Sequence, residues 1–331
     1  MSTSRRSFVK LAGGAAIAGA SGISASGASA QSAWPTKPVT IINPFAAGGG
    51  SDAFSRPLAQ ELTKQLGTSF IVDNRAGAGG TVGAGIAARS APDGYTMFTG
   101  AIHHTIAPSI YPKLTYDLEK DLLPICVMAM VPQVIVVNPQ KIKARTLPDL
   151  IAEMKANPGK INYGSAGNGT SHHLAGELFK IQAKVDISHV PYKGAGPAMQ
   201  DLMAGVIDVI FDGLGTSSSQ IKAGRIIPIA VAAKERAESI PNVPTTAEAG
   251  MPDYVVTTWY GMWAVTGTPK DIVDKMVVEH KKALASESLK PIWALQGAKV
   301  GITDPTEMAK FVNAEIARWA KVVKEADVKL D

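Results

Sequence analysis

Short apolar runs alternate along this chain with glycine-rich segments and with longer segments whose apolar residues recur at helical spacing. The short runs are rich in β-branched residues, as is typical of buried strands. They predict strands at Val39–Ile42, Phe70–Val72, Thr96–Thr99, Val134–Val137, Ile161–Tyr163, Ile187–Val190, Val206–Phe211 and Ile227–Val231. The longer segments predict helices at Asp52–Gln65, Thr81–Arg89, Leu147–Lys155, Ser171–Ile181, Pro197–Ala204, Thr216–Ala223, Pro269–Ala285 and Thr306–Ala326. This alternation indicates an α/β fold with parallel strands.

The chain contains no Ser/Gly-rich linker or low-complexity tract, so two lobes would have to be joined by strands that cross between them. Two passages suit such crossings: Ile125–Val137, which Pro132 interrupts, and the aromatic-rich Val255–Val265. They predict one lobe from residues 31–131 and 255–331, and a second lobe from residues 132–254. Each lobe would hold a mostly parallel sheet. A single large sheet is the alternative.

The first thirty residues predict an export signal that is removed from the mature protein. A basic start precedes the apolar stretch Leu11–Ile23, and a small-residue cleavage site follows at residues 28–30, before Gln31. Residues 4–10 contain Arg5 and Arg6 and resemble a twin-arginine signal, so we expect a periplasmic location. A membrane anchor is the alternative, but about 13 weakly apolar residues are too few to cross a hydrocarbon core of ~30 Å.

Charge and cysteine content narrow the function classes. The formal net charge of +5 at pH 7 falls close to neutrality when Arg5, Arg6 and Lys10 of the export signal are set aside. This balance predicts neither nucleic acid nor a membrane surface as a partner. The single cysteine, Cys126, excludes an internal disulfide, and its apolar neighbours predict a buried, unreactive thiol.

Two loops with few side chains carry the candidate chemistry. The first follows the strand predicted at Val39–Ile42 and comprises Phe45, Ala46, Ala47, Gly48, Gly49, Gly50, Ser51 and Asp52. The second follows Ile161–Tyr163 and comprises Ser165, Ala166, Gly167, Asn168, Gly169 and Thr170. Glycine lets backbone N–H groups approach a ligand closely, and each following helix start adds partial positive charge. Because neither loop has a lysine or arginine, amides and hydroxyls would bind a carboxylate there.

The two loops would face each other across a cleft if they belong to different lobes, because ligands of open α/β sheets bind beyond the carboxyl ends of the strands. Each loop alone is equally compatible with a plain strand-to-helix turn. Residues 83–88 match a relaxed dinucleotide-binding pattern. They lie inside a predicted helix and lack the acidic partner residue, so we expect no cofactor.

Two histidine pairs are further candidates. His172 lies at a helix start beside the second loop and is expected to line the site, whereas His173 points about 100° away. His103 or His104 could face the ligand or be satisfied by local backbone. Adjacent histidines lack the i, i+4 spacing of a helical metal site, so no metal is expected.

The sequence favours a binding protein over an enzyme. It contains no G-x-S-x-G, H-E-x-x-H or C-x-x-C motif, so no residue is assigned a catalytic role. A periplasmic carboxylic-acid isomerase or hydrolase that uses His103 or His104 is the alternative.

Several motifs in order along the mature chain resemble one known family, the substrate-binding receptors of tripartite tricarboxylate transporters, or Bug receptors. The motifs are residues 44–52, 72–80, 92–96, 163–170, 190–194, 201–208 and 244–250. The resemblance implies a periplasmic-binding-protein fold of the Venus-flytrap kind, type II-like, in a passive receptor. It also implies docking on a permease with a large and a small membrane subunit.

The resemblance further implies that the two loops clasp one carboxylate, partly through bound waters, while the rest of the pocket selects the other end of the ligand. Tyr192 and Asp212 complete the predicted ligand-binding set. Residues 103–108 depart from the family pattern, so they do not identify the ligand among dicarboxylates, tricarboxylates, aromatic acids and amino acids. We expect a monomeric receptor that closes about a hinge when the acid binds.

Overall fold

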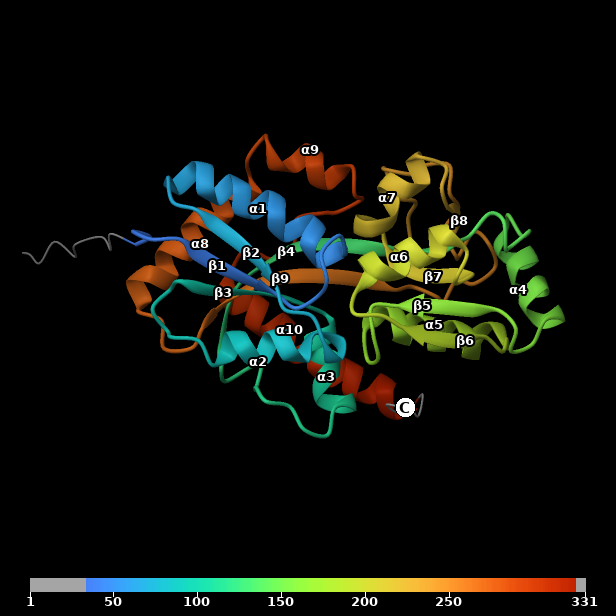
Figure 1. Ribbon diagram of the computed structural model, residues 1–331, viewed down its shortest axis with the longest axis horizontal. Coiled ribbons are helices and arrows are strands. Elements are labelled where there is room, and N and C mark those ends of the chain that lie inside the picture. The colour runs from blue at the N-terminus through green and yellow to red at the C-terminus, as the bar shows by residue number, and fades with distance from the viewer. Residues whose placement is uncertain (1–33, 326–331) are drawn as a thin grey trace, which may run out of the picture. The chain divides into compact units, whose positions relative to one another are not determined.

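The computed structural model describes residues 34–325, so the predicted export signal lies outside the described residues (Figure 1). Strands and helices alternate as the sequence predicts. The strands are β1 (Val39–Asn43), β2 (Phe70–Asn74), β3 (Thr96–Ala101), β4 (Leu122–Val137), β5 (Asn162–Ser165), β6 (Ser188–Pro191), β7 (Val209–Gly213), β8 (Ile227–Val231) and β9 (Thr257–Val265). No helix within residues 34–325 is long and apolar enough to span a membrane.

Ten α-helices and one short 3-10 helix, η1 (Ala78–Gly80), connect the strands of the described chain. The α-helices are α1 (Gly50–Leu66), α2 (Thr81–Ala88), α3 (His103–Ile110), α4 (Leu147–Ala156), α5 (Ser171–Ala183), α6 (Ala195–Ala204), α7 (Leu214–Lys222), α8 (Lys270–Leu284), α9 (Leu289–Ala294) and α10 (Pro305–Glu325). Eight of them, all but α3 and α9, correspond to helices that the sequence predicts. Their boundaries differ from the predicted ones by a few residues.

The strands form two mixed sheets that share β4, in the order β2-β1-β3-β9-β4-β7-β5-β6, with β8 also on β4. In the first sheet β1, β2 and β3 are parallel, and β9 joins antiparallel to β3. In the second sheet β5, β6 and β7 are parallel, while β4 joins antiparallel to β7 and β8. The two predicted crossing passages are therefore long antiparallel strands beside the parallel ones.

Strand β4 changes partner at Pro132. Its residues up to Pro132 pair with β9, whereas Gln133 to Val137 pair with β7 and β8. Proline has no N–H to donate to a ladder, so it suits the point where one pairing ends. The hydrogen-bonded ladder is continuous through β4, and this strand is the direct link between the two sheets. The predicted lobe boundaries at residues 131/132 and 254/255 stay a prediction.

Helices cover both faces of the sheets, as Figure 1 shows. One apolar cluster lies under α1, α8, α6 and α7 and runs across both sheets. A second lies under α4 and α5, and a third under α2, α3 and α10. Trp259 and Trp263 of β9 are almost fully buried in the third cluster. Burial of each large apolar side chain stabilises the fold by about 1.5–3 kcal/mol.

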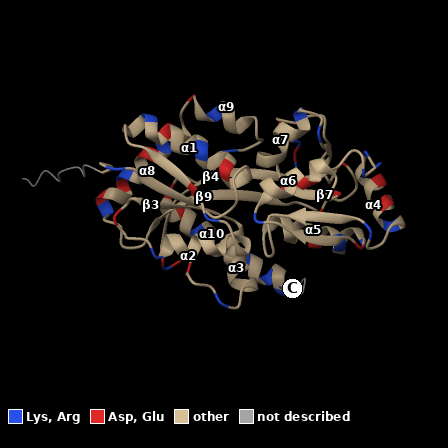
Figure 2. Cartoon of the chain, viewed as in Figure 1, with Lys and Arg blue, Asp and Glu red and all other residues tan. Residues whose placement is uncertain are grey.

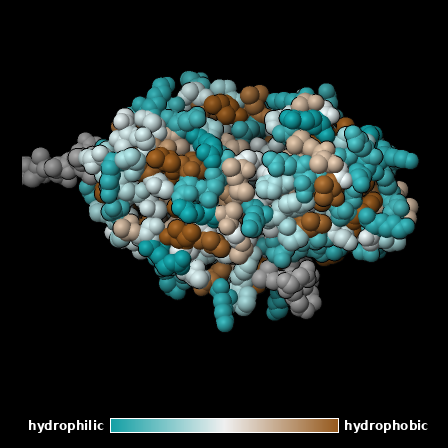
Figure 3. Space-filling model, viewed as in Figure 1, coloured by the Kyte–Doolittle hydropathy of each residue, from teal (hydrophilic) through white to brown (hydrophobic). Residues whose placement is uncertain are grey.

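The surface carries mixed charge and small apolar patches in the view of Figures 2 and 3. Basic and acidic residues are interspersed on α1, α4 and α8, with few charges along the central strands (Figure 2). Apolar residues on this face lie in separate patches among hydrophilic ones (Figure 3). Cys126 is buried, as predicted, and burial raises the pKa of its thiol to about 12, so the thiol stays protonated.

Two of the differences from the sequence-based expectation have a clear local cause. Helix α3 begins at His103, directly after β3, in a segment whose apolar residues show no clear helical period and which contains Pro108. Strand β7 begins at Val209 and not at Val206, because Gly205 ends α6 in a left-handed conformation and Val206 is 60% exposed. The apolar run therefore extends beyond the strand into the preceding turn.

Candidate functional site

The structure brings residues of both predicted loops to one small cavity. It is lined by Phe45, Gly49, Gly50, Ser51, His103, Ala166, His172, Ala195 and Tyr260. Its volume of about 10 Å³ accommodates roughly one water molecule. Seven of these nine residues belong to the predicted ligand-binding set, so the loops share a cavity instead of lying on separate surfaces.

The first loop leaves β1 at Asn43, whose side chain organises the turn. Asn43 Oδ1 accepts hydrogen bonds from the Ser51 hydroxyl, at 2.8 Å, and from the Phe45 N–H, at 3.4 Å. Gly48 adopts φ +79°, a conformation that favours glycine. No side chain caps the start of α1 at Gly49, so its first amides keep their partial positive charge for a ligand.

Asp52 turns back into the first loop. Its Oδ2 accepts from the Gly48 N–H at 3.1 Å and from Arg56 Nε at 2.8 Å, and its Oδ1 accepts from Asn74 Nδ2 at 3.1 Å. Burial alone would raise the pKa of this carboxyl, but these hydrogen bonds and the charge of Arg56 outweigh burial and lower it. Asp52 is therefore an ionised group that holds the loop in shape.

The second loop uses its hydroxyl groups internally. Ser165 Oγ lies 2.6 Å from His189 Nε2 and accepts from the Gly167 N–H at 3.0 Å. Thr170 caps α5 by accepting from the His173 N–H, and its hydroxyl donates to the Gly167 carbonyl at 2.7 Å. The inner surface of this loop is thus formed by Ala166 and the backbone, with His172 beside them.

His103 faces the cavity and links α3 to α5. Its Nδ1 accepts the Ser171 N–H at 3.0 Å, so its own N–H must be on Nε2. Its ring packs edge-on against Phe45, with centroids 5.0 Å apart, and against His172, at 5.8 Å. Burial and the neighbouring histidines His172 and His104 lower the pKa of His103 well below its ordinary value, so the ring is neutral.

His104 is satisfied by local backbone instead. Its Nδ1 accepts from the Ala101 N–H at 2.9 Å, and its ring packs edge-on against Phe98, with centroids 4.9 Å apart. Burial lowers its pKa to about 4. Of the two histidines left open by the sequence, the structure therefore directs His103 to the cavity.

His172 and Asp212 form a buried pair behind the cavity. His172 Nε2 lies 3.7 Å from Asp212 Oδ1, and both side chains are almost completely buried. Asp212 is the next-to-last residue of β7, and its Oδ2 accepts a hydrogen bond from the Ser217 hydroxyl. Burial raises the pKa of Asp212 to about 7 despite hydrogen bonds from Ser217 and the Gly213 N–H, and burial lowers the pKa of His172 to about 4.

Tyr192 and Asn168 lie outside this cavity. They line an outer groove of about 640 Å³ together with Ala78, Gly79, Tyr111, Gly167, Pro191, Lys193 and Pro197. The Tyr192 hydroxyl donates to Asp201 Oδ2 at 2.7 Å. Seven residues of the predicted set therefore line the inner cavity and three line this outer groove, while others, such as His104 and Asp212, line neither.

Direct contacts join loops of the two sheets beside the cavity. The Ala46 N–H donates to the Lys193 carbonyl at 3.0 Å, and the Tyr111 hydroxyl donates to the Asn168 carbonyl at 2.8 Å. A Cβ on Gly196 would lie 2.5 Å from the Ala47 carbonyl oxygen. Because the cavity holds only about one water molecule, it has no room for a larger molecule while these contacts are made.

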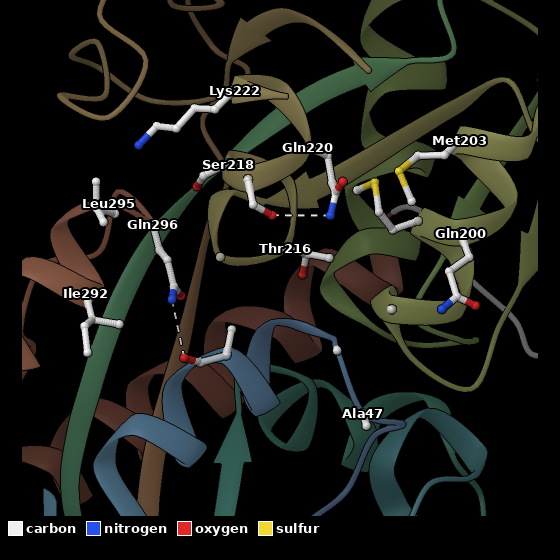
Figure 4. A pocket seen from close by; sticks show the side chains of 16 residues that line it. Ala47, Gln200, Met203, Thr216, Ser218, Gln220, Lys222, Ile292, Leu295 and Gln296 are labelled. Carbon is white, nitrogen blue, oxygen red and sulfur yellow. Dashed lines mark hydrogen bonds between the residues drawn. The ribbon is translucent and has the colours of Figure 1, made fainter. Parts of the chain in front are cut away.

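A second groove, of about 600 Å³, lies on the other side of the first loop, between α1 and α9 beside the first sheet and α6 and α7 beside the second (Figure 4). Figure 4 shows amide and hydroxyl side chains from several of these helices around it, with Lys222 at one end. Ala47 and Gly48 line it as well. The first loop therefore separates the groove from the inner cavity.

Two cavity residues are absent from the sequence-based set. Ala195 starts α6 between Gly194 and Gly196, and this third glycine-flanked helix start was a signal of the same type as the two chosen loops. Tyr260 comes from β9, and its hydroxyl occupies the place where a side chain on Gly50 would lie. Only its aromatic-rich strand distinguishes Tyr260 in the sequence.

Replacement of His103 tests its link to α5. His103→Ala is expected to weaken ligand binding about tenfold. The Ser171 N–H would lose its acceptor, and the imidazole ring would no longer line the cavity. Asparagine places an oxygen near the position of Nδ1, so His103→Asn should recover part of the affinity. Calorimetric titration of both variants measures the difference, and equal losses would contradict a role for Nδ1.

Comparisons with known proteins place this chain in a family. The family model described as tripartite tricarboxylate transporter family receptor matches residues 54–328. The periplasmic binding protein BugD is 33% identical, with 89% of this chain and 99% of that chain covered and a TM-score of 0.86. An R. palustris protein with adipate is 36% identical, with 89% and 99% covered and a TM-score of 0.86. MatC from Rhodopseudomonas palustris with bound malate is 33% identical, with 88% and 100% covered and a TM-score of 0.83.

These similarities confirm the predicted fold class. Each extends over nearly the whole described chain and over almost all of the other protein. The chain therefore has the two-lobed α/β fold of periplasmic binding proteins.

Proposed function

Because this chain belongs to the tripartite tricarboxylate transporter receptor family, we propose that it is a periplasmic receptor that captures a small organic carboxylate and delivers it to a membrane permease. The observation that carries this proposal is the meeting of two loops, poor in side chains, at one cavity. The permease would have a large and a small membrane subunit. The receptor would act as a monomer.

The chemistry of the cavity suits an anionic head group. The uncapped start of α1 offers backbone N–H groups and the positive end of a helix dipole. His103 adds an N–H on Nε2, and Tyr260 adds a hydroxyl. An aliphatic dicarboxylate is the first candidate, because two structural neighbours at 33% and 36% identity hold malate and adipate.

Capture would proceed by opening and closing about β4 and β9. Both strands pair within the first sheet, and β4 continues into the second sheet. Separation of the loops would break the contacts between Ala46 and Lys193 and between Tyr111 and Asn168, and closure on the acid would restore them. The closed form is then the form that a permease recognises.

The hydrogen bonds and the pKa values of the two histidines support binding without turnover. An isomerase or hydrolase that uses His103 or His104 would need a ring nitrogen free to take a proton. Nδ1 of each ring already accepts a backbone N–H, and burial lowers the pKa of both rings. We therefore assign His103 to ligand binding and His104 to the support of its helix.

A thermal-shift screen of the mature protein tests the proposed function. We expect malate, adipate or a related acid to raise the unfolding temperature, because a ligand at 100 times its dissociation constant adds about 2.7 kcal/mol of stability. Citrate, benzoate, aspartate, glucose and AMP complete the panel. Stabilisation by glucose or AMP with no effect of any acid would contradict the proposal, and consumption of a bound acid, followed by NMR, would favour the enzyme alternative.

A further inference from the structure

The buried pair His172 and Asp212 contains polar atoms that no other group satisfies. Nδ1 and Nε2 of His172 and Oδ1 of Asp212 lack hydrogen-bond partners among the described residues. The side chain of His172 is 3% exposed and that of Asp212 is fully buried. Unpaired polar atoms at this depth carry an energetic penalty, so their persistence points to a role in binding.

The two ring nitrogens of His172 differ in their surroundings. Nε2 lies 3.7 Å from Asp212 Oδ1, so a small movement would bring the two atoms within hydrogen-bonding distance. The ring lines the inner cavity, whereas Asp212 does not. Nδ1 is therefore the nitrogen available to a bound molecule.

We propose that Asp212 and His172 share a proton, and that this proton makes His172 Nδ1 a hydrogen-bond donor to the carboxylate of the bound acid. This inference rests on the proposed function and adds the side chains that recognise the anion. His172 would contact the ligand, and Asp212 would act through His172 as a positioning residue.

The location of the hydrogens follows from the number of protons on the pair. When the pair holds its extra proton, either Asp212 is neutral and donates to Nε2, or His172 is an imidazolium that donates from Nε2 to Asp212. Nδ1 carries a hydrogen in both cases and donates to the ligand. When that proton is lost, the ionised Asp212 keeps the remaining hydrogen on Nε2, and the lone pair of Nδ1 repels a carboxylate.

Of the pair and the titratable groups around it, Asp212 is the group suited to titrate near neutrality. Burial raises its pKa to about 7. On α3, the pKa of His103 is lowered well below its ordinary value, mainly by burial. On β9, burial and the charge of Asp212 raise the pKa of Tyr260. On α1, Asp52 has a lowered pKa because its hydrogen bonds and Arg56 outweigh burial.

The direction of the pH dependence follows from linkage. The acid binds the form of the pair that holds the extra proton, so binding raises the pKa of the pair. Carboxylate affinity is therefore at its full value below pH ~7 and falls by up to about tenfold per pH unit above it, until the pKa of the bound form is reached. Simple carboxylates are ionised throughout this range and contribute no slope of their own.

Calorimetric titration with malate and with adipate between pH 6 and pH 9 tests the assignment. The unchanged protein should lose affinity as the pH rises. In Asp212→Asn, the amide nitrogen replaces the protonated oxygen and donates to His172 Nε2, so the dependence on pH should disappear. His172→Ala should bind at least about tenfold more weakly at pH 6 and should show no slope.

Ser217→Ala provides a second test that does not depend on the folding of Asp212→Asn. It removes a hydrogen bond that stabilises the ionised Asp212, so the loss of affinity should begin at a higher pH. Ser219→Ala, at an exposed position of the same helix, is the matched control and should keep the original profile.

A flat profile for the unchanged protein, the original slope in Asp212→Asn, or an unshifted profile in Ser217→Ala would overturn the assignment. The absence of binding by any acid at pH 6 would instead overturn the proposed function itself.

Discussion

A Gly196→Ala variant is expected to bind its carboxylate roughly 5- to 150-fold more weakly, because overpacking by one methyl group costs about 1–3 kcal/mol. The added Cβ would lie 2.5 Å from the Ala47 oxygen, 3.0 Å from the Gly48 carbonyl carbon and 3.1 Å from the Gly49 nitrogen. These are backbone atoms of the first loop and cannot rotate away. Since the proposed opening would separate the two loops, the clash would raise the free energy of the closed form alone.

The fold of the Gly196→Ala variant should be intact, because the residue lies in the first turn of α6 and alanine favours a helix by about 1 kcal/mol over glycine. Urea unfolding without ligand checks this point, and calorimetric titration measures the affinity. Gln200→Ala, at an exposed position one turn further along α6, is the matched control and should bind normally. Normal affinity in Gly196→Ala would show that binding does not require contact between these loops.

An Asp52→Ala variant is expected to lose about 2–4 kcal/mol of unfolding free energy, because several partly buried donors lose their acceptor at once. The Gly48 N–H and Asn74 Nδ2 both donate to this carboxylate. The contribution of Arg56 is small, because its side chain is 45% exposed and solvent screens the ion pair. The first loop would also lose its shape, so carboxylate affinity should fall with stability.

The contribution of Asp52 to stability has a defined pH range. The folded protein lowers the pKa of this carboxyl below the ordinary value of 3.8, so the stabilisation is complete above that value and is lost as pH falls through the folded pKa. The difference between Asp52→Ala and the unchanged protein should be constant from pH 6 to pH 8 and shrink in acid. Urea unfolding at each pH measures it.

Asp274→Ala, which removes a well-exposed ion pair with Lys270 on α8, is the control for Asp52→Ala and should change stability little. A similar loss in both variants would contradict the organising role of Asp52.

The histidines illustrate why part of the site could not be read from the chain. His103 and His104 are adjacent and chemically identical in the sequence. The Ser171 N–H donates to His103, and the Ala101 N–H donates to His104. Ser171 is distant from His103 along the chain, so the sequence gives no sign of this contact. Tyr260 was not predicted for the same reason, because its partner Gly50 belongs to another part of the chain.

Local pattern was enough for the elements that depend on local forces. Apolar periodicity, glycines and helix starts determined the α/β class, the strands and the two loops, because these features follow from backbone sterics and the burial of one face. The short helix α3 was not predicted, because the spacing of its apolar residues does not indicate a helix. Packing against α10 stabilises it instead.

The sequence by itself therefore predicted which segments of this protein are candidates for binding an anion. The tertiary structure decided that they meet at one cavity, that His103 and not His104 faces it, and that Asp212 lies buried behind His172. The reason is physical: backbone preferences act between neighbours in the chain, whereas burial, pKa and hydrogen-bond partners depend on residues that only folding brings together.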